Sequence, residues 1–243
     1  MKTMLILLRR IRQKLLYEGS LKKYMLYAVG EIFLLVIGIL IALQINNWNE
    51  AKKARKIELY ILKEIHKNLE LDVLDLQEND RLLAKSINHM KIILDYLDNK
   101  RPYDDTLELH LQSFSLFPHF WQNTSGFEML KSRGLETISN EILRTEITYL
   151  YDNDYELMKT WEREILDFIN IYVYKEEFSK FLTKNSKTVP KNYELLIEDT
   201  HFREIVSKNS SLFKYIYNRY FSATLKRAIV LNKRVNTEIN QLE

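Results

Sequence analysis

The chain has no cysteine, and its 243 residues include only five glycines and three prolines. Without cysteine there can be no disulfide and no thiolate metal ligand, although this absence fits a reducing or an oxidising compartment equally. The scarcity of glycine and proline removes the turn residues that an all-β or α/β protein of this length needs. The sequence therefore predicts an all-α fold built from long helices.

Common catalytic signatures are also missing. The sequence contains no G-x-S-x-G, no Walker loop and no dinucleotide fingerprint, and its histidines form neither H-E-x-x-H nor the pair of Glu-x-x-His motifs that a di-iron bundle site needs. His201 and Glu204 share a helix face, but a solvated surface pair explains them. We therefore expect no cofactor, no metal site and no enzymatic activity. The alternative is a membrane-anchored enzyme of unfamiliar type, with acid and base groups in a helical cleft.

The net charge of +3 is unevenly distributed. Residues 1–49 hold seven basic and two acidic residues, whereas the rest of the chain holds 29 basic and 31 acidic residues. A nucleic-acid-binding protein usually carries its basic face on the folded domain, so we expect no nucleic-acid partner. A basic block beside an apolar run is typical of the cytoplasmic side of a membrane.

The apolar run predicts one transmembrane helix. Residues 32–43 are uninterruptedly apolar, and the extended stretch 24–45 rises about 33 Å as a helix, enough to cross the hydrocarbon of a bilayer. We place the span at residues 24–48, between a basic amphipathic cytoplasmic segment (1–23) and an extracytoplasmic helical domain (49–243).

Glu31 is the only charge within this span, and two interpretations are open. Its carboxylate can reach the cytoplasmic interface near the start of the apolar run, where the helix dipole favours a negative charge. Alternatively, it is a buried carboxyl group that contacts a second membrane helix. Gly38 and Ala42 form a small-xxx-small face on which such a helix could pack, so these three residues are the candidate membrane-helix contacts.

The flanking charges predict the orientation. The basic region before the run exceeds twenty residues and no small-x-small cleavage site follows it, so an uncleaved anchor is favoured over a signal peptide. More basic residues precede the span than follow it, which predicts a cytoplasmic N-terminus and an extracytoplasmic C-terminal domain. Residues 2–18 are typical of an amphipathic helix lying on the inner leaflet.

Beyond the span the apolar residues keep helical spacing. The pattern predicts one helix over 49–98, ended by Asn99 and Pro102. It fits a two-chain coiled coil, or one long arm of a bundle within the chain, which we favour. A heptad-like pattern over 217–242 predicts its antiparallel partner.

The middle of the chain predicts shorter elements. We expect a short helix over 105–117, and then a helix that begins with a Ser125/Glu128 capping box and ends at Gly134. Ser139 or Asn140 should cap the next helix.

The following region is expected to turn at Asp152-Asn153-Asp154 and to continue as a helix over 155–182. Residues 183–198 are polar and contain a proline, which favours a long connection.

Two segments carry a resemblance to a known family. YAVGEIFLLVIGILIALQINNWNE, preceded by IRQKLLYEGSLKKY, resembles the N-terminal hallmark of domain of unknown function family 6090, membrane-anchored proteins met chiefly in Bacteroidetes-type bacteria. SGFEMLKSRGLETISNEILRTEITYLYD is similar to the family's second typical region. The resemblance implies a single inner-membrane anchor with a helical domain, and it brings no assigned activity.

The candidate interaction surface is a cluster around His119, Trp121 and Asn123, with Arg133 following. Aromatic and polar groups on a loop that starts with proline can form a ligand or partner surface. The alternative is that the aromatic residues close the end of the bundle while the polar ones cap a helix. The sequence thus favours a single-pass membrane protein whose domain serves protein or small-ligand interaction, as a possible homodimer or with an envelope protein partner.

Overall fold

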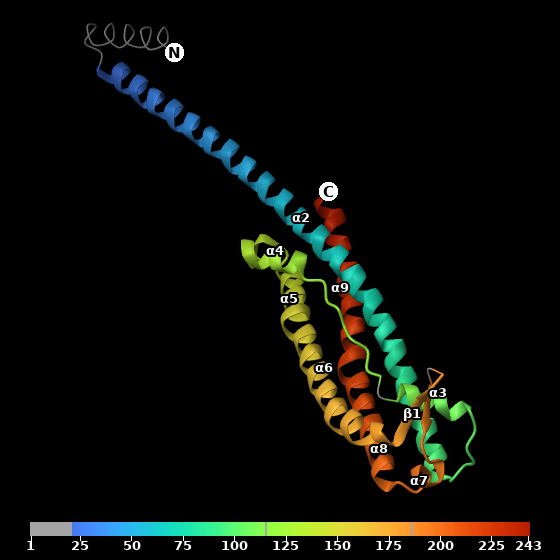
Figure 1. Ribbon diagram of the computed structural model, residues 1–243. Coiled ribbons are helices and arrows are strands. Elements are labelled where there is room, and N and C mark those ends of the chain that lie inside the picture. The colour runs from blue at the N-terminus through green and yellow to red at the C-terminus, as the bar shows by residue number, and fades with distance from the viewer. Residues whose placement is uncertain (1–20, 115, 186) are drawn as a thin grey trace. The chain divides into compact units, whose positions relative to one another are not determined.

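The computed structural model describes residues 21–243 except 115 and 186 (Figure 1). The chain divides into two compact units between Lys56 and Ile57, and helix α2 (Leu21–Asp98) contributes residues to both. The helix is continuous through the predicted boundaries at residues 23 and 48, which therefore stay predictions. The amphipathic helix expected over 2–18 lies outside the described residues.

In the first unit, α2 exposes its apolar side chains. Leu34 is 70% and Ile39 53% exposed, and the apolar residues around them are similarly open. Within the described residues, α2 contains the one stretch that is long and apolar enough to cross a membrane, judged by length and composition.

The second unit is built around three long helical arms, which Figure 1 shows packed together. The first is residues 57–98 of α2. The second runs through α5 (Glu141–Tyr149), η2 (Leu150–Tyr155), α6 (Glu156–Phe168) and η3 (Ile169–Glu177). The third runs through α8 (Thr200–Ile216), η5 (Tyr217–Phe221) and α9 (Ser222–Leu242). Each arm buries apolar residues at steps of three and four, so the three stripes form one core.

The third arm is antiparallel to α2. Lys63 near the start of the α2 arm pairs with Glu243 at 2.6 Å, and Asp98 at its end pairs with Arg203 at 2.5 Å. Between them, His66 is hydrogen-bonded to Asn232 at 2.6 Å. These contacts confirm the predicted antiparallel long-helix bundle, and the bounds of α2 confirm the helix end at Asp98.

A long crossing links the first arm to the second. It consists of α3 (Thr106–Ser113), a segment over 116–124 that we call the strap, α4 (Ser125–Arg133) and η1 (Leu135–Thr137). The helix expected over 105–117 is confirmed in a shorter form, because the strap begins before Pro118.

The α4 helix begins differently from the predicted capping box. Its N-cap residue is Thr124, without a side-chain cap bond, and Asn68 of α2 instead accepts hydrogen bonds from the Gly126 N–H (2.8 Å) and the Ser125 hydroxyl (3.1 Å). A Cβ at Gly126 would lie 2.6 Å from the backbone nitrogen of Ile65, so the close approach of the two helices requires glycine.

Two further predictions at helix ends are confirmed. Gly134 follows α4 with φ 101°, a backbone conformation that residues other than glycine rarely adopt. The Asn140 side chain accepts a hydrogen bond from the Leu143 N–H at 3.1 Å and so caps α5.

The structure corrects two connections. Asp152-Asn153-Asp154 is no turn: it lies within η2, a π-helical stretch that joins α5 to α6. The predicted connection 183–198 contains regular structure, because β1 (Phe181–Lys184) pairs antiparallel with β2 (Lys187–Pro190) and α7 (Tyr193–Ile197) follows. This hairpin is an unpredicted addition to a mostly helical fold.

Candidate functional site

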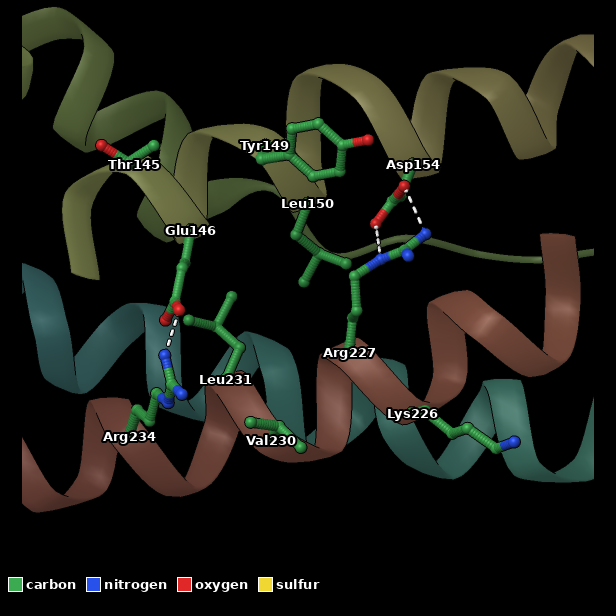
Figure 2. A pocket seen from close by; sticks show the side chains of 10 residues that line it. All are labelled: Thr145, Glu146, Tyr149, Leu150, Asp154, Lys226, Arg227, Val230, Leu231 and Arg234. Carbon is green, nitrogen blue, oxygen red and sulfur yellow. Dashed lines mark hydrogen bonds and ion pairs between the residues drawn. The ribbon is translucent and has the colours of Figure 1, made fainter. Parts of the chain in front are cut away.

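A groove lies between α5, η2 and α9, with a volume of about 400 Å³. Its floor is apolar, since Leu150 and Leu231 are almost fully buried and meet between the helices (Figure 2). Tyr149 and Val230 line the groove while about half exposed. This size is within the usual range of small-molecule sites.

Two ion pairs between the helices close the ends of the groove (Figure 2). At one end, Nε and Nη2 of Arg227 donate to the two carboxylate oxygens of Asp154 at 2.5 and 2.7 Å. At the other end, Nη1 of Arg234 donates to Glu146. The Asp154 side chain is only 6% exposed, whereas Glu146 is 36% and Arg234 54% exposed. The first pair is therefore structural, and the second can exchange partners with solvent.

The π-helical stretch η2 shapes this end of the groove. The wider turns of a π-helix are rare in proteins, and those that do occur are often found at functional sites. Here four of the six residues are buried, namely Leu150, Tyr151, Asp154 and Tyr155. The stretch therefore directs one carboxylate into the groove and two tyrosine rings into the core.

A second hollow of about 290 Å³ continues along the same two helices toward Asn140 and Gln241. Glu146 and Arg234 line both hollows. Their ion pair therefore forms the partition between the two spaces.

Polar side chains of α2 hold the strap. The Ser86 hydroxyl donates to the Leu116 carbonyl and the Asn79 amide to the His119 carbonyl, both at 2.9 Å. The backbone N–H of Trp121 donates to Asp75 at 3.0 Å. These bonds satisfy backbone groups that the strap cannot pair within itself.

Asp72 is fully buried and is the most deeply buried acid among the α2 side chains that bind the strap. One of its oxygens accepts hydrogen bonds from the Asn123 N–H (2.8 Å) and side-chain amide (2.9 Å). Burial raises the pKa of Asp72 to about 6, against the lowering effect of the Asn123 hydrogen bonds. Burial also raises the pKa values of Tyr151 and Tyr155, to which the charge of Asp72 adds.

The structure brings three of the four predicted surface residues together on the strap. His119 pairs with Glu162 of α6, and the Trp121 ring meets the His119 ring edge to face at a centroid distance of 4.3 Å. Asn123 is half-buried and its side-chain amide donates a hydrogen bond to Asp72, while Trp121 is 71% exposed. Arg133 lies exposed at the far end of α4. Whether the four form an interaction surface stays a prediction.

Exposed apolar side chains border the strap. Leu71 lies one helical turn before Asp75, which binds Trp121, and Leu82 lies one turn before Ser86, which binds Leu116. We define the α2–strap surface as the exposed residues Leu71, Leu74, Leu82, Leu116 and Trp121.

The predicted membrane-helix contacts lie on the first unit. Glu31, Gly38 and Ala42 are exposed, and apart from its chain neighbours and the backbone of its own helix no described atom lies within 4 Å of a Cβ built at Gly38. Their spacing of seven and then four residues places them on one helix face. Their role stays a prediction.

Sequence reasoning missed the groove residues Glu146, Asp154, Arg227 and Arg234. Asp154 gave a misleading signal, because two aspartates around an asparagine are typical of a turn. The two arginines are seven residues apart on a heptad-like helix, a spacing that indicates a shared face. That signal could have identified them as a pair. No group of three or more His, Asp or Glu side chains in the described residues could hold a metal ion.

A model of a family of unknown function, DUF6090, matches residues 31–213, well over half of the chain. The chain belongs to this family. The DUF6090 match begins at Glu31 and ends within α8, so it covers most of the predicted span, the strap and most of the bundle. No curated protein and no solved structure is significantly similar to the chain.

Proposed function

We propose that this DUF6090 protein is a single-span protein of a bacterial inner membrane, with a cytoplasmic N-terminus and a periplasmic helical domain. Support comes from the exposed apolar surface of α2 in the first unit, in a window where none of the residues is buried. The basic excess before the apolar run favours this orientation. The family resemblance to proteins of Bacteroidetes-type bacteria supports the compartment.

The domain serves protein interaction in the envelope, and the partner is a second copy of the chain. The observation that carries this proposal is the α2–strap surface, where a tryptophan and four leucines of α2 and the strap are exposed. Monomeric proteins rarely leave large contiguous apolar patches open to water. Because a shared membrane gives two anchored copies the same direction, their α2 helices can meet side by side.

Charge within the surface also fits a second copy. Glu78 and Arg81 lie between Leu74 and Leu82 and are paired with each other at 2.6 Å, with both side chains more than half exposed. Across a two-fold axis, Glu78 of one copy can pair with Arg81 of the other, so the patch is self-complementary. The candidate contacts Glu31, Gly38 and Ala42 would extend the association within the membrane.

Cysteine cross-linking tests this proposal directly, because the natural chain has no cysteine. The full chain in native membranes would carry Leu74→Cys, or Leu195→Cys on α7 as a control of similar exposure. Mild oxidation should convert most of the Leu74→Cys variant to a covalent dimer and leave the control monomeric. Equal dimer formation at both positions, or none at either, would show that the surface does not bind a second copy.

The expectation that the protein is not an enzyme stays a prediction, and the alternative of an unfamiliar enzyme stays open beside it. Reporter fusions after residue 60 and at the C-terminus test the orientation. At both positions we expect activity from a reporter that works only in the periplasm. Activity from a reporter that works only in the cytoplasm would show that the proposed topology is wrong.

A further inference from the structure

The α5–α9 groove combines an apolar floor with a cation that can accept another anion. Arg234 has five N–H donors in its guanidinium group, and its Nη1 donates to Glu146. The side chain is 54% exposed, so a second carboxylate can approach it beside Glu146 or in place of it. Guanidinium groups bind carboxylates in a planar, two-bonded geometry.

The charges lining the groove favour an anionic ligand. Lys226, Arg227 and Arg234 line the groove together with Glu146 and Asp154, which gives the lining an excess of one positive charge. Asp154 is buried and bonded twice to Arg227, so that pair stays closed. The free binding capacity therefore lies at the Arg234 end.

We propose that the α5–α9 groove binds a small amphiphile with one carboxylate head, the head on Arg234 and the apolar chain over Leu150, Val230 and Leu231. Arg227 and Arg234 are seven residues apart on one helix, so the groove between them is about 10 Å long. An extended octanoate chain is of similar length. A fatty acid and the C-terminus of an apolar peptide offer the same chemistry.

The test measures equilibrium binding of radiolabelled octanoate to the full chain in phosphatidylcholine nanodiscs, with empty nanodiscs subtracted. Arg234→Gln should weaken binding about tenfold, because one charge-assisted contact is lost. Glu146→Gln should tighten binding severalfold, because it removes the carboxylate that competes for Arg234. Since either change breaks the same exposed ion pair, a purely structural role would move both affinities in the same direction.

Matched controls separate the site from general effects. Lys233→Gln removes a neighbouring charge that lines neither hollow, and it should leave the affinity unchanged. Val230→Trp should fill the groove and abolish binding, whereas Asn236→Trp, on the same helix but outside both hollows, should not. Competition by octanol, which lacks the carboxylate, shows whether the head group or the apolar chain carries the binding. Competition by acetyl-Leu-Leu, in its free-acid and its amide form, shows whether a peptide C-terminus can replace the fatty acid.

Saturable binding with these opposite effects supports the proposal, whichever carboxylate competes better. Three results would overturn it: no saturable binding, octanol competing as well as octanoate, or equal losses from Arg234→Gln and Lys233→Gln. None of these variants lies on the α2–strap surface, so the test stands apart from self-association.

Discussion

Over residues 25–45 α2 exposes leucine, isoleucine and valine, whereas over residues 57–98 the same helix buries Glu58, Asn68, Asp72, Asn79 and Ser86. Each stretch departs from the usual placement of side chains in water, but in opposite ways. The buried polar groups are explained within the chain, because the strap and its neighbours supply their hydrogen-bonding partners. The exposed apolar groups are covered by no other described residue, and we propose that lipid covers them instead. Folding supplies the partners of the buried polar groups, whereas the exposed apolar groups need a partner outside the chain.

The largest expected effect is on the apolar stretch. The double substitution Leu35→Arg and Ile39→Arg should cost roughly 6 kcal/mol of membrane insertion, about 3 kcal/mol for each arginine near the centre of a span. Carbonate-washed membrane pellets would measure the retained fraction, and we expect most of it to be lost.

The control for this experiment is Ile142→Arg with Leu195→Arg, since both residues are 71% exposed in the second unit. Retention of the span variant in the pellet would show that the exposed apolar residues do not anchor the protein.

The next effect concerns the pH dependence that Asp72 gives to stability. Because its folded pKa of about 6 lies above the ordinary aspartate pKa of 3.8, the folded state holds this proton more tightly than the unfolded state. Its contribution is therefore complete below pH 3.8 and is lost as the pH rises through 6, an order-of-magnitude loss of about 3 kcal/mol. Asp72→Asn should remove this loss.

Urea unfolding of the natural protein and of the Asp72→Asn variant between pH 3.5 and 7 measures the difference in their unfolding free energies. Acids with lowered pKa values, such as Asp104, have the opposite pH dependence, but they are common to both chains and cancel in the difference. A constant difference across this range would contradict the raised pKa of Asp72.

A smaller effect is expected at Asn68. Asn68→Ala should cost about 2 kcal/mol of unfolding free energy, because the buried Gly126 N–H loses its acceptor. Asn68→Asp keeps an acceptor oxygen at the start of α4 and should recover most of the loss. If the alanine and aspartate variants are equally unstable in thermal melts, loss of the acceptor for the Gly126 N–H does not explain the instability of Asn68→Ala.

The smallest effect is expected at Ser86. Ser86→Ala removes the hydrogen bond to the Leu116 carbonyl and should cost about 1 kcal/mol in urea unfolding. Ser132→Ala is the matched control, since that exposed hydroxyl bonds the Met129 carbonyl within its own helix and its loss should be nearly neutral. Equal costs would mean that the strap contributes no more than a surface hydroxyl does.

Local signals predicted much of the fold. The end of α2 at Asp98, the cap at Asn140 and the glycine after α4 depend on residues within one or two turns, so the sequence carried them. The strap could not be predicted this way, because Asp72 and Asn123 are distant along the chain and their hydrogen bond exists only after folding. The groove likewise depends on which helix packs against α5, and the π-helical stretch η2 was hidden by turn-forming residues.

The pairing of α2 with α9 also decides when the domain can fold. Ile61, Leu62 and Ile65 leave the ribosome long before α9 exists, and α9 completes the arm that packs against this part of α2. Contacts between such distant segments form slowly, and an uncovered apolar helix invites aggregation while it waits. The order of synthesis thus leaves these early core residues only partly covered until translation reaches α9.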